Sequence, residues 1–217
     1  MKIFLDSTNI EEIREINKLG IIDGITTNPS LIAKSGKGFN QILENICKEV
    51  KGPVSAEVTA ENFENMLSEA KILSKISKNI VIKLPLTFNG LKACKHLTKK
   101  NYKTNVTLCF TVPQAILAAK AGATYISPFI GRLDDIGQNG INLIKDIKKV
   151  FSNYTNFKTK ILAASVRSIE HVTEVAKAGA DISTIPTKIF HQLYKHELTD
   201  KGLKIFLEDW EKSKQKI

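Results

Sequence analysis

A lysine lies inside an apolar segment, Asn79-Ile-Val-Ile-Lys-Leu-Pro-Leu86, whose composition is typical of a buried parallel strand. Burial disfavours the charged ammonium form and lowers the pKa of a lysine. Lys83 is therefore a candidate amine nucleophile that forms a Schiff base with a carbonyl substrate. The alternative is a lysine on an edge strand, pointing to solvent and discouraging aggregation. The segment alone favours this second interpretation, so the other strands must decide.

The elements that would position Lys83 alternate between strands and helices. Between the strands, apolar residues return at spacings of three and four, as over residues 143–150, which is typical of amphipathic helices. Segment 6–9, after the first strand, lacks the glycine-rich phosphate loop of a doubly wound sheet. The pattern predicts one α/β domain, residues 1–217, folded as a (β/α)8 TIM barrel. The eight expected strands are 2–6, 22–26, 54–58, 80–83, 104–108, 124–127, 160–164 and 181–184.

A further segment follows the eighth unit and is expected to form an extra C-terminal helix, about residues 199–214. It places Leu203, Phe206, Leu207 and Trp210 at helical spacing. This apolar stripe needs cover, either from its own barrel or from a neighbouring subunit.

Polar residues occupy the carboxyl ends of the predicted strands, where barrel active sites lie. A closed barrel has no edge strand, so this convergence favours the nucleophile interpretation of Lys83. The residues concerned are Asp6, Thr26, Asn28, Glu57, Lys83, Thr107, Ser127, Ser165 and Arg167.

A nucleophilic lysine needs groups that move protons on and off the substrate oxygen. Glu57 is the best-placed carboxylate, on the strand next to that of Lys83, and Thr107 on the other neighbouring strand can position a water. Asp6 could deprotonate a substrate hydroxyl and so trigger carbon–carbon cleavage. An alternative for Asp6 is a cap of the helix that begins near Asn9.

Two arginines after the sixth and seventh predicted strands suggest anion recognition. The planar guanidinium of Arg132 or Arg167 suits bidentate phosphate binding, and the Ser165 hydroxyl adds a donor. The alternative is ordinary surface ion pairs with Asp134, Asp135 or Glu170. Barrel phosphate sites often use the late loops, which favours phosphate.

The composition bounds the remaining classes of function. The net charge of +10 keeps a basic nucleic-acid-binding protein as an alternative, but the lysines are spread over nearly every predicted helix. Neither the three separated cysteines nor the four histidines have the spacing of a metal site, and we expect no metal or cofactor. No stretch has the length of a membrane span, and the N-terminus lacks the features of a signal peptide. We therefore expect a cytoplasmic protein.

Five longer segments together resemble the short, single-domain transaldolases and their fructose-6-phosphate aldolase relatives, and the resemblance covers essentially the whole chain. The segments are DGITTNPSL at 23–31, IKLPLT at 82–87, QAILAAKAGA at 114–123, SPFIGRLDD at 127–135 and AASVR at 163–167.

The resemblance implies a cofactor-free Schiff-base enzyme acting on sugar phosphates and assembled as a ring-shaped homo-oligomer, a pentamer or a decamer. It implies the imine lysine at Lys83, the acid/base aspartate at Asp6, and the water-positioning pair at Glu57 and Thr107. Asn28 and Ser127 match residues that hold substrate hydroxyls, while Arg132, Ser165 and Arg167 match the phosphate-binding group. Glu57 and Phe129 are of the transaldolase type, because the aldolases carry Gln and Tyr there.

Overall fold

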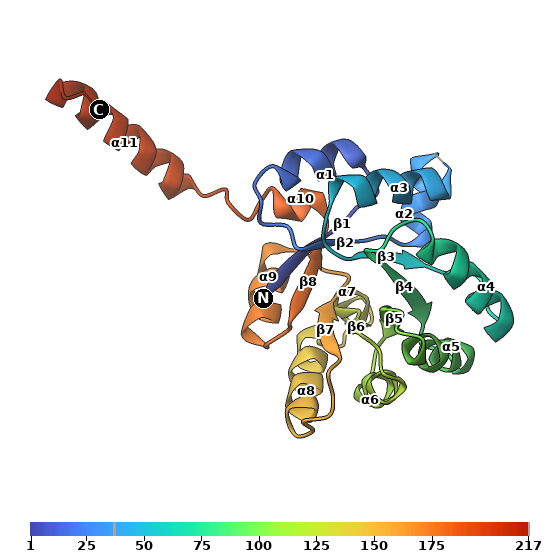
Figure 1. Ribbon diagram of the computed structural model, residues 1–217. Helices are drawn as coiled ribbons and strands as arrows, with labels where there is room; N and C mark the ends of the chain where they lie inside the picture. Colours follow the sequence, from blue (N-terminus) through green and yellow to red (C-terminus); the bar gives the residue numbers. More distant parts are fainter. Residues whose placement is uncertain (37, 217) are drawn as a thin grey trace.

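Eight parallel strands, each hydrogen-bonded to two neighbours, close into a barrel in sequence order (Figure 1). The computed structural model describes residues 1–36 and 38–216, so Lys37 and Ile217 of the expected range 1–217 lie outside it. All eight expected strands form, with ends shifted by a few residues, and the (β/α)8 barrel is confirmed. The strands are β1 (Lys2–Asp6), β2 (Gly24–Thr26), β3 (Val54–Glu57), β4 (Ile80–Pro85), β5 (Thr104–Cys109), β6 (Tyr125–Pro128), β7 (Lys160–Ala163) and β8 (Ile182–Ile185).

Helices surround the barrel, and most begin at a side-chain cap. Asn9, Asn62, Thr87, Thr111 and Ser168, for example, each accept a hydrogen bond from a backbone N–H of the first helical turn. The helices are α1 (Ile10–Asn17), α2 (Pro29–Ser35), α3 (Phe39–Glu49), α4 (Phe63–Ser74), α5 (Phe88–Lys99), α6 (Val112–Ala121), α7 (Ile130–Asp134), α8 (Gly140–Ser152), α9 (Ile169–Lys177), α10 (Thr187–Phe190) and α11 (Glu197–Ser213).

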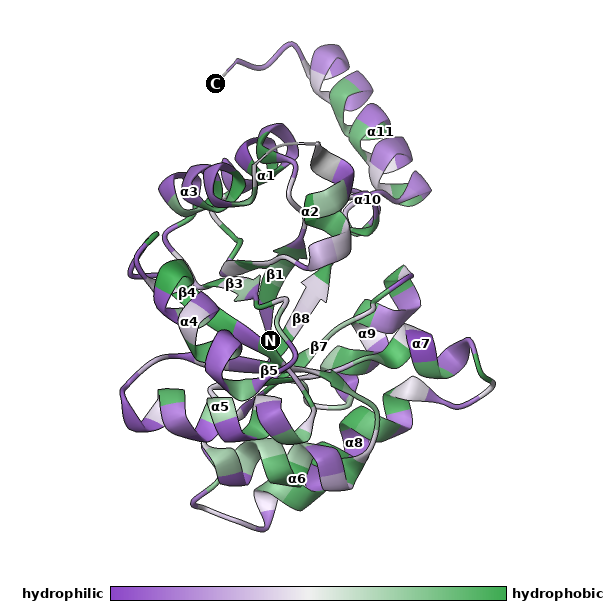
Figure 2. Ribbon diagram, turned by 90° about the vertical axis from the view of Figure 1, so that its right-hand side faces the viewer, coloured by the Kyte–Doolittle hydropathy of each residue, from purple (hydrophilic) through white to green (hydrophobic). Residues whose placement is uncertain are grey.

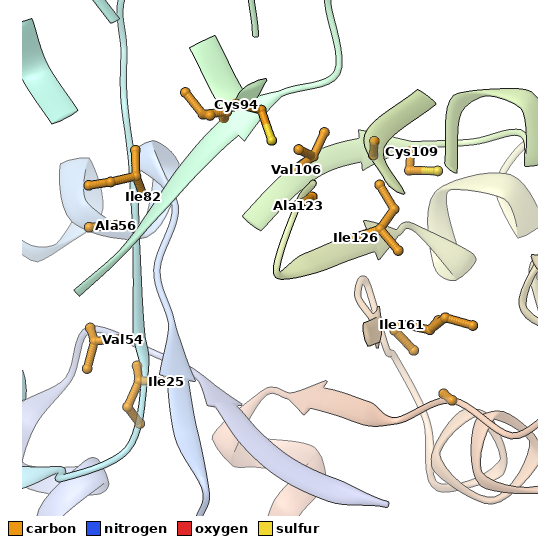
Figure 3. Packing of buried hydrophobic residues seen from close by; sticks show 14 of the residues in the cluster. Ile25, Val54, Ala56, Ile82, Cys94, Val106, Cys109, Ala123, Ile126 and Ile161 are labelled. Atoms are coloured by element: carbon orange, nitrogen blue, oxygen red, sulfur yellow. The ribbon is translucent and has the colours of Figure 1, made fainter. Parts of the chain in front are cut away.

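Alternation along the strands separates the apolar core from the polar interior of the barrel. Ile25, Val54, Ile82 and Val106, on four successive strands, belong to the large buried cluster that includes helix residues such as Cys94 (Figure 3). Successive residues of a strand point to opposite faces. The neighbouring positions therefore face the barrel axis, and many of these carry polar side chains.

The lower part of the barrel interior is filled by a small separate cluster of Phe4, Leu162 and Ile182, against which Tyr125 packs. Gly24 leaves room for it, because a Cβ at this position would lie 2.8 Å from the Phe4 ring and 2.6 Å from the Pro53 carbonyl oxygen. Phe4 and Ile182 lie two residues before Asp6 and Thr184 on their strands, so this cluster forms the base of the barrel beneath those polar side chains.

We expect Gly24→Ala to destabilise the protein by about 2 kcal/mol, since extra volume in a packed core forces side chains and backbone to shift. Thermal or urea unfolding measures the change. A matched Gly202→Ala substitution, on helix α11 where a Cβ would meet nothing within 4 Å, should not lower stability. An unchanged stability of Gly24→Ala would contradict this account of the barrel base.

The expected C-terminal helix is present as α11, and it extends away from the barrel (Figure 1). None of its residues, all of which the structure describes, is buried. Hydrophobic and hydrophilic residues alternate along the helix (Figure 2). Its exposed apolar residues include Leu203, Phe206, Leu207 and Trp210.

Over residues 1–36 and 38–216, no helix combines the length and the apolar composition needed to cross a membrane.

Candidate active site

Lys83 lies on β4 inside the closed barrel, and the residue is only 5% exposed. Its Nζ donates a hydrogen bond to the Thr27 carbonyl oxygen at 3.0 Å and lies 2.9 Å from Oε2 of Glu57. Glu57 is the direct neighbour of Lys83 in the β3–β4 register, which explains this close approach. Because β4 pairs with strands on both sides, the edge-strand interpretation of Lys83 is wrong.

The Nζ group faces a hollow of about 230 Å³ at the carboxyl ends of the strands. The fold brings together here all of the predicted site residues except Glu57 and Thr107. The lining residues are Asp6, Thr26, Asn28, Lys83, Ser127, Phe129, Arg132, Leu162, Ala164, Ser165, Arg167 and Thr184. A larger hollow of about 540 Å³ beside α1 and α10 shares Asp6 with this cavity but not Lys83.

Asp6 ends β1 and holds its carboxylate within the cavity. Burial raises the pKa of Asp6, and the nearby Lys83 charge and a hydrogen bond from Thr26 oppose that shift without cancelling it. Thr26 Oγ1 donates to Asp6 Oδ1 at 2.8 Å and lies 2.6 Å from Thr184 Oγ1. The helix-cap alternative for Asp6 is wrong, because Asn9 caps α1.

Glu57 contacts Lys83 but does not line this cavity. It lines a second hollow, of about 370 Å³, together with Thr59 and Glu69. Glu57 thus both contacts the Lys83 amine and borders this second hollow. This placement suits a group that exchanges protons with the amine without occupying the space of the substrate.

Thr107 lies on β5, next to a register shift between Val106 and Cys109 and before Leu108, whose φ is +61°. Such irregularities occur at active sites, where they redirect a side chain. The Oγ1 of Thr107 is buried and finds no hydrogen-bond partner among the residues that the structure describes. A buried hydroxyl without a partner is costly, so this group is a candidate to hold a water.

We expect Thr107→Val to leave stability unchanged or slightly raised, because the substitution removes a buried hydroxyl that has no protein partner. Turnover should fall by about 10- to 100-fold if the hydroxyl positions a catalytic water. Thr26→Val is the contrasting variant, since its hydroxyl has two partners and its loss should lower stability. The unfolding midpoints and initial rates of the two variants test whether the Thr107 hydroxyl contributes to turnover and the Thr26 hydroxyl to stability. Wild-type turnover in Thr107→Val would refute a catalytic role for Thr107.

The two arginines occupy one side of the cavity. The Arg132 guanidinium lies 5.0 Å from the centre of the Phe129 ring, a cation–π contact, while Arg167 pairs with Asp135. Ser165 between the strand and Arg167 has φ of +60°, a conformation that non-glycine residues rarely adopt outside functional sites. Arg167 thus forms the surface ion pair with Asp135 that was the alternative to phosphate binding. A phosphate would have to share or replace the contact between Arg167 and Asp135.

Asn28 has a structural function as well as a place in the cavity. Its Oδ1 accepts a hydrogen bond from the Leu31 N–H at 3.0 Å and caps α2. The side-chain amide N–H groups are therefore what Asn28 can offer to a substrate hydroxyl.

Asn105 was not predicted from the sequence as a site residue; it is fully buried and joins two serines inside the barrel. It donates to Ser55 Oγ at 3.2 Å and accepts from Ser127 Oγ at 2.7 Å. Strand alternation could have identified it, because Asn105 lies two residues before Thr107 and so faces the same side. Thr184 lines the cavity but was not predicted as a site residue, because threonine is common in strands.

Among residues 1–36 and 38–216, no three or more His, Cys, Asp or Glu side chains cluster so that they could hold a metal ion.

The fold and the site define a TIM-barrel protein whose axial cavity presents a buried lysine amine, a carboxylic acid and two arginines. The model of the Transaldolase/Fructose-6-phosphate aldolase family matches residues 3–217, and the chain belongs to this family. The family membership expected from the sequence is thus confirmed.

Similar proteins include three named "Probable transaldolase". The protein of Bartonella tribocorum is 58% identical over 217 residues, and that of Brucella ovis is 57% identical over 217 residues. The protein of Caldicellulosiruptor saccharolyticus is 58% identical over 216 residues. In each case the similarity covers 100% of this chain and 100% of the relative.

Proposed function

We propose that this protein is a class I transaldolase of the non-oxidative pentose phosphate pathway. It transfers a dihydroxyacetone unit from sedoheptulose 7-phosphate to glyceraldehyde 3-phosphate, giving erythrose 4-phosphate and fructose 6-phosphate. The observation that carries the proposal is the buried Lys83 amine, 2.9 Å from Glu57, in a cavity shared with Asp6 and two arginines. The names of the close relatives support the same reaction.

The reaction begins with attack of the neutral Lys83 amine on the C2 carbonyl of the ketose phosphate. Glu57, in contact with Nζ, frees this amine by taking a proton from the Lys83 ammonium group. After the attack, the proton that the nitrogen loses passes to the C2 oxygen, and the proton held by Glu57 converts the resulting hydroxyl group into the departing water. A water held by Thr107 can connect these sites. The product is an iminium ion at C2, which withdraws electrons from the bond between C3 and C4.

Asp6 takes the proton of the C4 hydroxyl in the next step. The C3–C4 bond then breaks, its electron pair forms the enamine at C3, and an aldose phosphate leaves. The enamine carbon adds to the aldehyde of a second aldose phosphate, and Asp6 returns its proton to the new C4 oxygen. Hydrolysis of the iminium ion releases the new ketose phosphate and restores the Lys83 amine.

The remaining cavity residues bind the substrate in this proposal. Thr26 and Thr184 orient the Asp6 carboxylate, and the Asn28 amide and Ser127 hydroxyl hold hydroxyl groups of the transferred unit. Arg132, Ser165 and Arg167 bind the phosphate of the aldose part.

Fructose-6-phosphate aldolase is the nearest alternative, and the choice concerns the fate of the enamine. A tyrosine hydroxyl could protonate it and release dihydroxyacetone, whereas the position is Phe129 here, with its ring in contact with Phe110 and Arg132. The enamine therefore waits for an acceptor aldehyde.

An acceptor-dependence assay tests the transferase proposal. With fructose 6-phosphate as donor, we expect sustained turnover with erythrose 4-phosphate and almost none without an acceptor. Steady release of dihydroxyacetone in the absence of acceptor would favour the aldolase. A nucleic-acid-binding protein would instead bind DNA or RNA with an affinity that falls steeply with salt, and would not turn over sugar phosphates.

We also propose a homo-oligomer, a pentamer or a decamer, in which α11 covers a neighbouring subunit. The support is the exposed apolar stripe of α11 together with an apolar hollow of about 700 Å³ lined by Ile3, Ile16, Leu19, Phe190 and Leu193, among others. Sedimentation of the full chain should give a ring-sized particle, and deleting the segment after Lys195 should reduce its size. A monomeric full chain would contradict the proposal. Phosphorylated sugars are metabolites of the cytoplasm, which agrees with the expected location.

A further inference from the structure

Asp135 contacts one of the cavity arginines, Arg167, and also feels the charge of the other, Arg132. It follows the short helix α7, which carries Arg132, and its carboxylate accepts hydrogen bonds from both terminal nitrogens of Arg167. The Nη2–Oδ2 distance is 2.7 Å. The hydrogen bonds from Arg167 and the charges of both arginines hold the pKa of Asp135 below its ordinary value. The Asp135 carboxylate is thus an anion placed within reach of the proposed phosphate-binding groups.

The second edge of the Arg167 guanidinium faces the backbone. A Cβ on Gly131 would lie 2.7 Å from Nε and 2.9 Å from Cδ of Arg167, so the inner edge packs over this glycine. A guanidinium binds a carboxylate or phosphate through one of its two forks. The terminal fork of Arg167, formed by Nη1 and Nη2, is therefore the one available to an anion in the cavity. Asp135 occupies this fork.

We propose that Asp135 is a specificity-determining residue that competes with the substrate phosphate for the terminal fork of Arg167. The proposal rests on the proposed function of the same cavity. A phosphate ester must displace the Asp135 carboxylate before it binds Arg167, whereas an unphosphorylated sugar leaves the pair intact. Asp135 therefore weakens phosphate binding, which assists release of a phosphorylated product.

The solvent exposure of the Arg167–Asp135 ion pair indicates that Asp135 competes with phosphate instead of only positioning Arg167. The side chains of Arg167 and Asp135 are 49% and 51% exposed, and ion pairs of this kind contribute little. A phosphate offers more charge and three acceptor oxygens, so it can replace the carboxylate. By contrast, the buried pair of Lys83 and Glu57 is shielded from such exchange.

The inference is tested with Asp135→Asn, which keeps the shape of the side chain and removes its charge. We expect the dissociation constant of inorganic phosphate, measured by titration calorimetry, to fall about three- to fivefold. The KM for fructose 6-phosphate should fall by a similar factor, with kcat unchanged or slightly lower. Inactivation by borohydride with unphosphorylated dihydroxyacetone should proceed at the wild-type rate, because this ligand does not need Arg167.

Two further variants separate direct competition from a general charge effect. Asp135→Glu keeps the anion and should show wild-type phosphate affinity. Glu170→Gln removes an equal charge three residues after Arg167 in the sequence, from an exposed carboxylate that bonds locally to Ser168. It should change phosphate affinity much less than Asp135→Asn.

Unchanged or weaker phosphate binding in Asp135→Asn would overturn the inference, as would an equal gain in Glu170→Gln. Calorimetry gives this answer even for an inactive enzyme. If the wild type shows no borohydride inactivation with dihydroxyacetone, the proposed function fails separately. Normal inactivation with unaltered phosphate affinity in Asp135→Asn rejects the competition alone.

Discussion

Replacing Lys83 by methionine is expected to reduce transaldolase turnover by at least about 10⁴-fold, the scale seen when a covalent nucleophile is removed. Methionine matches the length and apolar stem of lysine, so the barrel interior stays filled. The variant lacks the amine, and no iminium ion can form at C2 of the donor. Rates with fructose 6-phosphate and erythrose 4-phosphate measure the loss, and activity within tenfold of the wild type would contradict the assignment.

The same substitution also alters stability, because it leaves the Glu57 carboxylate without its 2.9 Å partner. Removing one member of a fully buried ion pair costs about 3–5 kcal/mol, and we expect about 2 kcal/mol here because the Glu57 side chain keeps 13% exposure. The double variant Lys83→Met, Glu57→Gln removes the unpaired charge. The unfolding midpoint of the double variant should return most of the way to the wild-type value, while its activity stays absent. This result would separate the chemical role of Lys83 from its structural role.

Asp6→Asn is expected to have the second-largest effect, a loss of about 10²- to 10⁴-fold in kcat through removal of the acid/base group. The amide oxygen of asparagine can still accept the hydrogen bond from Thr26, so the cavity should keep its shape. Imine formation at Lys83 should persist, and borohydride should still trap the donor on the enzyme. Loss of trapping together with turnover would place Asp6 in imine formation instead of carbon–carbon cleavage.

The raised pKa of Asp6 predicts the pH dependence of both activity and stability. The proposed cleavage step uses the carboxylate form, so kcat should fall on the acid side at a higher pH than an aspartate of ordinary pKa 3.8 would give. For stability, the folded state binds the proton more tightly than the unfolded state. Between the unfolded and the folded pKa, the free energy of unfolding therefore decreases as pH rises.

Asp6→Asn removes this penalty of a buried charge. At neutral pH the variant should be more stable than the wild type by about 1 kcal/mol, a typical size for a stabilising substitution. The difference should shrink as pH falls through the folded pKa, where the wild-type carboxyl becomes protonated. Urea unfolding at several pH values tests this, and a variant less stable than the wild type at neutral pH would contradict it.

The barrel could be predicted from the sequence because strand segments and helical spacing repeat along the whole chain. The strand boundaries were predicted less accurately, and β2, for example, begins at Gly24 instead of Ile22. The close packing of Phe4 and Pro53 around Gly24 arises only in the folded barrel, so the sequence alone did not reveal it. Helix α11 was expected from its apolar spacing, but the sequence did not decide what covers its apolar stripe, and the structure leaves that stripe exposed.

Most of the cavity was predicted because barrel topology brings strand ends together. The pairing of Lys83 with Glu57 followed from adjacent strands. The separation of Glu57 and Thr107 from the main cavity did not, because it depends on side-chain directions and on the irregularity in β5. The contact of Arg167 with Asp135 was one of several ion pairs left open, since their geometry is set by the ends of α7 and β7.

Chemical trapping tests the central claim most directly. The enzyme is incubated with fructose 6-phosphate, reduced with borohydride, digested, and mapped by mass spectrometry, with Lys83→Met as the control. We predict a reduced, donor-derived adduct on the peptide that contains Lys83, and none in the control. An adduct on another lysine, or no donor-dependent adduct in an active preparation, would contradict the proposed mechanism.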